Sequence, residues 1–386
     1  MQPFAPFDVS WTENETLRHA QWRSENNSAP PKRIVTADDT LSADAAYRLA
    51  SQGSAILWRG DYHNGRQLLH ALTRRVHDKA AGKRKRKPGE PAVASALDEF
   101  NQHRLRQSQR AQLLNSLLVE LDADARIALR RAPDVSEACR AAIGATEQPF
   151  LLSVRALLGI VGAHEWRKKG VPVAGLPRPI HVHYGVFSPV RGEYIDLVFR
   201  APLPSRDLAF DIGTGSGVLA AVLAQRGVAK VIATDQDPRA LACARENLQR
   251  HGHADKVVLQ QVDMFPSGKA PLIVCNPPWL PAKPTTPIER AIYDPDNRML
   301  LAFLHGVPDH LADQGEAWLI MSDLAVRLGL RTPNFLEDAI ASAGLDVLDR
   351  LDIRPSHPKS ADAADPLHKA RRAEVTSLWR LGRKSL

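Results

Sequence analysis

Apolar residues in the first half of the chain recur at mainly helical spacing. The stretch Asn64–Lys79 places Leu68, Leu69, Leu72 and Val76 on one side of a helix. Ala55–Trp58 is a short apolar run that fits either a strand or a buried turn. The pattern predicts a mainly helical domain over residues 36–169, preceded by a polar arm at residues 1–35. Another predicted helix begins after Ser42, a plausible N-cap. Three more predicted helices span Ala94–Leu121, Ser136–Ile143 and Leu151–Trp166.

The second half instead carries short, continuous apolar runs, which are typical of buried parallel strands. Residues 170–180 hold three prolines and are predicted to be a linker, so that residues 181–386 form a second domain. A strand, a turn and a helix alternate through this part, which predicts an α/β fold. The predicted strands include Leu208–Phe210, Val231–Thr234, Val257–Val262, Leu272–Cys275 and residues 316–322.

The net charge of the chain is unevenly distributed between its two halves. The chain of 386 residues has a net charge of +8, and residues 1–180 hold 27 basic and 19 acidic side chains, whereas residues 181–386 hold 24 of each. A basic half beside a neutral half indicates either an acidic partner or a solvated surface. The run Lys83–Lys87 is five consecutive cations and is predicted to be an exposed loop that could contact phosphates.

Composition also excludes several classes of protein. No run approaches 18 uninterrupted apolar residues, and the first ten residues lack the basic-then-apolar form of a secretory signal. Cys139, Cys243 and Cys275 are far apart and odd in number, which fits neither a disulfide framework nor a zinc site. We therefore expect a cytoplasmic protein with reduced thiols, no metal and no membrane partner.

A glycine-rich turn follows the strand Leu208–Phe210. Asp211-Ile-Gly213-Thr214-Gly215-Ser-Gly217 leads directly into a predicted helix at Val218–Arg226. Glycines allow a tight turn and let a ligand approach the backbone, and the helix start offers free N–H groups. This spacing differs from the Gly-x-Gly-x-x-Gly dinucleotide fingerprint. Asp235 ends the next strand, where a carboxylate can accept both hydroxyls of a ribose, and Asp237 is a nearby competitor.

The sequence Asn276-Pro277-Pro278-Trp279 follows the strand Leu272–Cys275. Amide and aniline-like nitrogens are weak nucleophiles because their lone pairs are delocalised. The Asn276 side-chain carbonyl and the Pro277 backbone carbonyl can accept their N–H groups and so orient the lone pair. The two prolines make the loop rigid, and Trp279 can stack on a planar amide or base.

The two motifs together resemble class I S-adenosylmethionine-dependent methyltransferases, and within them the group that methylates amide or exocyclic amine nitrogens. Asn276–Pro281 is similar to the Asn-Pro-Pro-Tyr-Ile-Pro form of release-factor glutamine methyltransferases, with Trp279 in place of the tyrosine, and Phe187–Glu193 is similar to the segment before their cofactor strand. Related sequences methylate adenine or guanine in RNA or DNA. The resemblance covers about residues 181–350; the basic first 180 residues match no part of the glutamine enzymes.

This resemblance implies a doubly wound, Rossmann-like sheet of seven strands, with an antiparallel edge at Asp346–Ile353 and Glu374–Leu381. It also implies S-adenosylmethionine as cofactor and a macromolecular substrate, either RNA or a translation-related protein. Asn276, Pro277, Pro278 and Trp279 are the expected catalytic residues. The expected cofactor-binding residues are Asp211, Gly213, Thr214, Gly215, Gly217, Asp235 for the ribose, Asp263 and Met264 for the adenine, and Asn276.

Three other interpretations remain open at this point. A small-molecule methyltransferase would share the motifs but would leave the basic first half without a purpose. A non-catalytic nucleic-acid-binding protein could keep the methyltransferase fold without turnover. A nucleotide-dependent oxidoreductase would need the dinucleotide glycine spacing and has no use for Asn276–Trp279.

Overall fold

The computed structural model describes residues 4–82, 95–284, 288–355 and 367–384. The chain divides into an N-terminal unit (residues 1–94 and 101–165) and a C-terminal unit (residues 95–100 and 166–386). The division lies close to the boundary predicted from the sequence. The predicted linker belongs to the C-terminal unit, where Val171 pairs with Ile180 and Ile180 is fully buried in the core. No helix in the described ranges is long and apolar enough to cross a bilayer.

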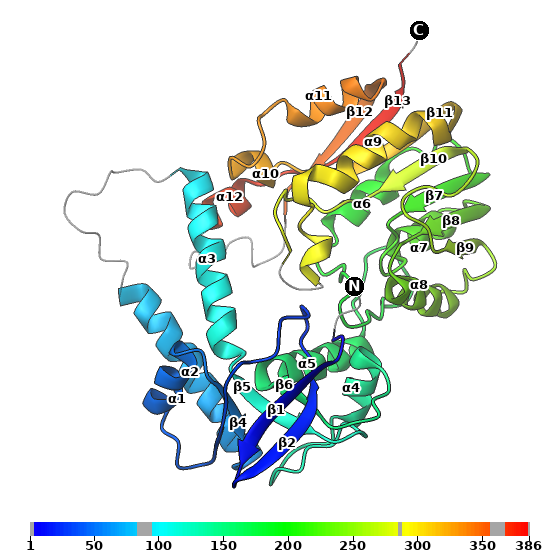
Figure 1. Cartoon of the computed structure of the whole chain (residues 1–386). Helices are drawn as coiled ribbons and strands as arrows, with labels where there is room; N and C mark the ends of the chain where they lie inside the picture. Colours follow the sequence, from blue (N-terminus) through cyan, green and yellow to red (C-terminus); the bar gives the residue numbers. More distant parts are fainter. Residues whose placement is uncertain (1–3, 83–94, 285–287, 356–366, 385–386) are drawn as a thin grey trace. The chain divides into compact units, whose positions relative to one another are not determined.

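The N-terminal unit is built around a six-stranded mixed sheet, of which Figure 1 labels every strand except β3. Its strands lie in the order β1-β2-β6-β5-β4-β3. The first two form a hairpin, and β3, β4 and β5 run parallel to one another. The strands are β1 (Phe7–Glu13), β2 (Thr16–Trp22), β3 (Ile34–Ala37), β4 (Ala55–Trp58), β5 (Leu117–Leu121) and β6 (Phe150–Ser153), and the helices are α1 (Ala43–Ser51), α2 (Tyr62–Gly82), α3 (Ala96–Leu114), α4 (Ser136–Ile143) and α5 (Val154–Lys169).

Helices α1 to α5 do hold most of the regular structure of residues 36–169, but the prediction of a mainly helical domain missed the sheet on which they pack, and the prediction of a polar arm at residues 1–35 is wrong. Residues 1–35 contribute the β1–β2 hairpin, whose Trp11 and Trp22 are buried. Two predicted helices each include a strand, since β5 is the end of the stretch Ala94–Leu121 and β6 the start of Leu151–Trp166. A short apolar run such as Leu117–Leu121 is too short to show a hydrophobic periodicity of its own. The sequence pattern therefore assigns it to the neighbouring helix. The N-cap Ser42 and the bounds of α4 are confirmed.

The C-terminal unit is a seven-stranded sheet with the order β12-β13-β11-β10-β7-β8-β9. Strands β7 to β11 are parallel, and β13 is antiparallel to both β11 and β12, which confirms the predicted fold and its antiparallel edge. The strands are β7 (Leu208–Ile212), β8 (Lys230–Thr234), β9 (Val257–Gln260), β10 (Ala270–Cys275), β11 (Leu311–Ser322), β12 (Leu345–Ile353) and β13 (Thr376–Arg383).

Helices cover both faces of this sheet, because side chains on a strand alternate between its faces. On β10, Leu272 and Val274 pack on one side with α6, α7 and α8, whereas Ile273 and Cys275 pack on the other with α9 and α11. The strands are therefore apolar throughout, as the sequence indicated. The helices are α6 (Glu193–Arg200), α7 (Val218–Gln225), α8 (Pro238–Arg250), α9 (Arg298–His310), α10 (Leu324–Arg327), α11 (Phe335–Ser342) and α12 (His368–Ala373).

The two sequence motifs meet at one edge of the sheet. Strands β7 and β10 are parallel neighbours in the centre (Figure 1), with Ile212 opposite Cys275. The glycine-rich turn leaves β7 at the next residue, Gly213, and the Asn276–Trp279 loop leaves β10 at Asn276. In open parallel sheets, ligands bind at the carboxyl ends of the strands. The fold therefore brings together two motifs that lie 63 residues apart in the sequence.

Candidate functional site

The glycine-rich turn is held against the end of the neighbouring strand β8. The backbone N–H of Thr214 donates to the carbonyl oxygen of Thr234 at 2.8 Å, and that of Gly215 donates to Oδ2 of Asp235 at 3.0 Å. Gly217 has a φ of 78°, and a Cβ there would lie 3.0 Å from Cα of Ala244 on α8. Only glycine fits this close, left-handed turn at the start of α7.

Asp211 lies beneath this turn and is almost completely buried. Its Oδ2 accepts the hydroxyl of Thr214 at 2.6 Å and the backbone N–H of Ala220 at 3.1 Å. Its Oδ1 is buried and has no hydrogen-bond partner among the described residues. Burial raises the pKa of Asp211 to about 6, and the nearby carboxylate of Asp235 adds to the rise. A buried carboxylate oxygen without a donor is suited to a cationic or hydrogen-bonding ligand.

The two candidates for a ribose contact differ in what already binds them. Asp237 is the N-cap of α8, where it accepts the backbone N–H of Arg239 and pairs with its guanidinium at 2.8 Å. Asp235 accepts backbone N–H groups from both loops, through Oδ1 from Asp237 and through Oδ2 from Gly215. Burial raises the pKa of Asp235. Asp235 therefore faces the glycine-rich turn, while Asp237 stabilises a helix.

Asp263 and Met264 follow β9 in the sequence and lie beyond the end of β8. Met264 has a φ of 70°, and its carbonyl oxygen accepts the hydroxyl of Thr234 at 2.6 Å. A methionine in the left-handed region is strained, and such strain is concentrated at functional sites. Asp263 is exposed, with Arg298 as a loose partner at 3.9 Å. Both residues are thus tied to the edge of the sheet that carries the glycine-rich turn.

The Asn276–Trp279 loop is closed by its own side chains. The indole Nε1–H of Trp279 donates to Oδ1 of Asn276 at 3.0 Å. Pro277 and Pro278 between them are buried, and Asn276 and Trp279 are half-buried. The Trp279 ring packs against the apolar clusters on both faces of the sheet. Burial raises the pKa of the neighbouring Cys275 thiol far above its usual range, so this thiol stays protonated and unreactive.

The structure adds residues that the motifs did not point to. Asp294 is buried and caps α9 by accepting the backbone N–H groups of Met299 and Leu300. A Cβ at Gly213 would lie 2.7 Å from the terminal methyl of Met299, so α9 begins beside the glycine-rich turn. Arg331 is buried and donates to Oδ1 of Asn297 at 2.8 Å. Asp294 and Arg331 lie outside both sequence motifs.

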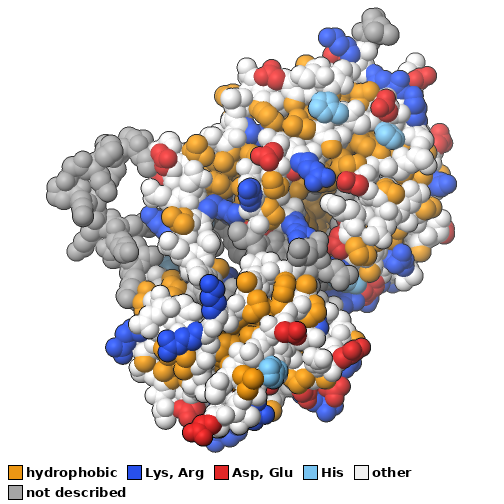
Figure 2. Space-filling model, in the orientation of Figure 1, with side chains coloured by type: hydrophobic (Ala, Val, Ile, Leu, Met, Phe, Trp, Pro, Cys, Tyr) orange, Lys and Arg blue, Asp and Glu red, His pale blue; other side chains and the backbone are white. Residues whose placement is uncertain are grey.

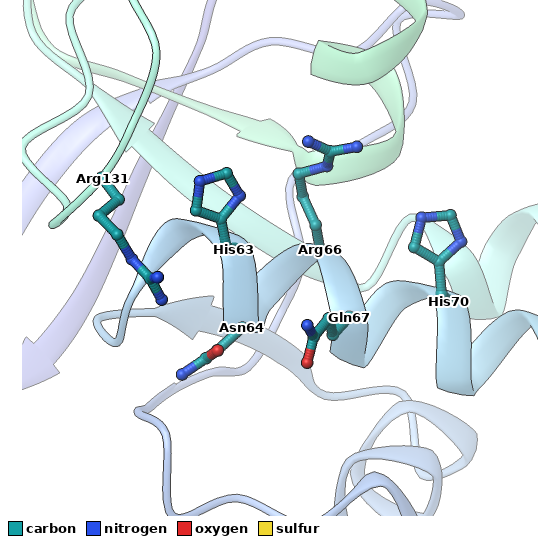
Figure 3. Close-up of a pocket in the computed structure, with 6 residues that line it drawn as sticks. All are labelled: His63, Asn64, Arg66, Gln67, His70 and Arg131. Carbon is teal, nitrogen blue, oxygen red and sulfur yellow. The ribbon is translucent and has the colours of Figure 1, made fainter.

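A separate pocket of about 360 Å³ lies in the N-terminal unit (Figure 3). Arg131, one of its lining residues, pairs with the buried Asp61 at 2.7 Å. None of the site residues expected from the sequence lines this pocket. It is lined by His63, Asn64, Arg66, Gln67, His70 and Arg131. Across the described parts of both units, no group of three or more His, Cys, Asp or Glu side chains could hold a metal ion.

The C-terminal unit is a doubly wound α/β sheet that brings the two loops together at the carboxyl ends of its strands. Residues 178–327, fewer than half of the 386 residues, match the model of the methyltransferase small domain family.

Three relatives show how far the similarity extends. The ribosomal protein L11 methyltransferase of Symbiobacterium thermophilum is 47% identical over 66 residues, which is 17% of this chain and 22% of the relative. A tRNA1(Val) (adenine(37)-N6)-methyltransferase of Shewanella amazonensis is 27% identical over 44% of this chain and 73% of its own length. A protein of Methanocaldococcus jannaschii assigned as a protein N5-glutamine methyltransferase is 26% identical over 38% and 76%. The chain thus spans about a fifth of the L11 enzyme.

Proposed function

We propose that this protein is an S-adenosylmethionine-dependent N-methyltransferase that acts on a primary amide or exocyclic amine of a macromolecule. The observation that carries this proposal is the pairing of β7 with β10, which sets Asn276 beside the glycine-rich turn. A methyl donor over that turn and a nitrogen held by Asn276 would be neighbours. Proximity of two reactants in a fixed geometry is a large source of catalysis.

The residues of the two loops fit the proposed cofactor. The orphaned Oδ1 of Asp211 and the open space at Gly215 suit the charged methionine end of the molecule. Asp235 would accept the ribose hydroxyls, since Asp237 is engaged by α8. Asp263 and Met264 would border the adenine, and Gly213, Thr214, Gly217 and Asn276 would complete the pocket. S-Adenosylmethionine supplies a sulfonium-bound methyl group, whose S–C bond breaks as the new N–C bond forms.

The reactive nitrogen is prepared by the Asn276–Trp279 loop. Oδ1 of Asn276 and the carbonyl oxygen of Pro277 would each accept one N–H of the substrate and turn its lone pair toward the methyl group. Pro278 would keep this loop rigid, and Trp279 would lie against the planar group. No general base is needed before attack, because the nitrogen can lose its surplus proton to water after transfer.

The substrate class is proposed from the relatives and from the charge. The named relatives act on a ribosomal protein, a tRNA adenine or a protein glutamine. The described part of the N-terminal unit holds 18 basic and 16 acidic residues, so it is nearly neutral. Figure 2 likewise shows both signs of charge interspersed over the visible face. The positive excess resides largely in Lys83–Lys87, which lies outside the described residues, and this run is the main argument for RNA.

The decisive experiment follows the methyl group. Tritium from labelled S-adenosylmethionine is transferred by the purified protein into a lysate of cells that lack it, and the product is split between ribonuclease and protease. Label lost only with ribonuclease identifies RNA, and label lost only with protease identifies the glutamine-type substrate. Label that survives both treatments would support DNA or a small molecule instead. An absence of label would contradict the proposed activity.

The Asn276→Ala variant tests the catalytic assignment. Without the amide oxygen the substrate nitrogen loses one of its two acceptors, so transfer should fall by at least about a hundredfold. Binding of S-adenosylmethionine, measured by calorimetry, should weaken by no more than a few-fold, because Asn276 is only one of several residues that would complete the cofactor pocket. If both transfer and cofactor affinity are lost together, Asn276 has a structural role and the assignment is wrong.

A further inference from the structure

The contact between Trp279 and Asn276 carries an inference that rests on the proposed function and deepens it. The indole N–H is a donor only, whereas the Asn276 side chain ends in one acceptor and one donor group. An indole 3.0 Å from that end therefore admits a single orientation of the amide, the one with Oδ1 toward Nε1. The contact fixes which atom of Asn276 lies on the side of Trp279.

The indole is well placed to impose this orientation because it is itself fixed. Its ring packs against the apolar clusters on both faces of the sheet, next to the buried Pro277 and Pro278. Asn276 is separated from Trp279 only by these two prolines, whose φ angles are locked. A ring held by packing and a loop held by proline leave little freedom at the hydrogen bond between them.

The hydrogen bond also determines how many donors the site can still satisfy. A carbonyl oxygen has two lone pairs, and the indole occupies one of them on Oδ1 of Asn276. One lone pair then remains there for a substrate N–H, and the carbonyl oxygen of Pro277 can take a second. Two acceptors match the two N–H groups of a planar NH2. A nitrogen that already carries a methyl group has only one N–H, so it would leave one of the two acceptors without a donor.

We propose that Trp279 is a positioning residue that orients the Asn276 amide through its indole N–H, so that the site accepts an unsubstituted NH2 group and adds one methyl to it. In that single transfer the nitrogen gains the methyl and then loses one proton to water. The donor sulfonium becomes a neutral thioether. The N–H of Trp279 acts through Asn276 and stays bonded throughout.

Two variants at position 279 separate this role from simple stacking. Trp279→Phe keeps an aromatic ring and removes the N–H, and Trp279→Ala removes both. We expect Trp279→Phe to lower the initial rate of tritium transfer into the lysate by about tenfold or more at saturating S-adenosylmethionine, with the loss in kcat. If stacking alone matters, Trp279→Phe will stay close to the unaltered protein and only Trp279→Ala will fall, which overturns the proposal.

The Asn276→Asp background supplies a matched control. A carboxylate has two equivalent oxygens, so there is no orientation left to select. In that background, Trp279→Phe should therefore lower the rate of methyl transfer by less than about threefold. The Asn276→Asp variant itself transfers the methyl group slowly. An equal loss in both backgrounds would mean that Trp279 acts independently of Asn276 and would refute the inference.

A spectroscopic measurement tests the contact without any turnover. The indole N–H resonance of Trp279, assigned by its disappearance in Trp279→Phe, should shift upfield and exchange faster with solvent in Asn276→Leu. An unmoved resonance would show that the hydrogen bond is absent and would overturn the inference alone. Absence of transfer by the unaltered protein would instead defeat the proposed function, so the two failures are distinguishable.

Discussion

At the scale of single residues, Asp211 couples the proposed cofactor site to pH. Its pKa lies near 6 in the protein because the carboxyl is buried, with one oxygen bonded to Thr214 and Ala220 and the other without a donor. The raised pKa favours the protonated form. The contribution of Asp211 to the folding stability of the ligand-free protein is therefore present at low pH and is lost as the pH rises through about 6. A cationic ligand beside Oδ1 acts in the opposite direction and favours the carboxylate.

We therefore expect S-adenosylmethionine to bind about tenfold more weakly at pH 5 than at pH 7.5, because most Asp211 side chains are protonated at pH 5. Calorimetric titrations across this range provide the measurement. Asp235 also has a raised pKa and would add to the same trend. Asp211→Asn is the control: its affinity should be low and much less dependent on pH. A wild-type affinity that is flat between pH 5 and 7.5 would remove Asp211 from the cofactor site.

At the scale of elements, an ion pair with one buried partner joins the segment before β7 to the antiparallel edge of the sheet. Glu374, two residues before β13, is completely buried and pairs with the half-buried Arg191 at 3.1 Å. It also accepts the hydroxyl of Ser322 at the end of β11, at 2.7 Å. Phe187–Glu193, singled out by its resemblance, is thereby attached to two strand ends. Removing one partner of a buried pair leaves an uncompensated charge.

Arg191→Met should accordingly lower the free energy of unfolding by about 3 kcal/mol, measured by urea denaturation of the full chain. The matched control is Arg200→Met, because Arg200 is exposed on α6 and, among the described residues, bonds only to a backbone carbonyl. That variant should change stability by less than about 0.5 kcal/mol. Combining Arg191→Met with Glu374→Gln should recover part of the loss. Equal stability of the Arg191→Met and Arg200→Met variants would contradict this account.

The same elements show why the sequence predicted one half of the chain better than the other. In the C-terminal unit, each apolar run is bounded by a recognisable turn such as Gly213–Gly217 or Pro277–Pro278, so strands and helices separate cleanly. In the N-terminal unit, β5 and β6 adjoin helices without a glycine or proline between them. The site depends on contacts across the sheet, so Met299 and Arg331 carry no local signal in the sequence.

At the scale of the whole molecule, the proposed RNA substrate can be tested at the run Lys83–Lys87. If the substrate is RNA, replacing these five residues by glutamine should weaken binding and lower the slope of log affinity against log salt, by up to about 3.5 for a single strand. Fluorescence anisotropy with labelled total tRNA at several salt concentrations measures both quantities. The charge-preserving variant Arg84→Lys/Arg86→Lys is the control and should keep the slope. A slope that survives neutralisation would assign the phosphate contacts to other residues. Lys168 and Lys169, which follow Arg167 at the end of α5, would then be the next cations to test, because these three form the longest remaining run of basic residues.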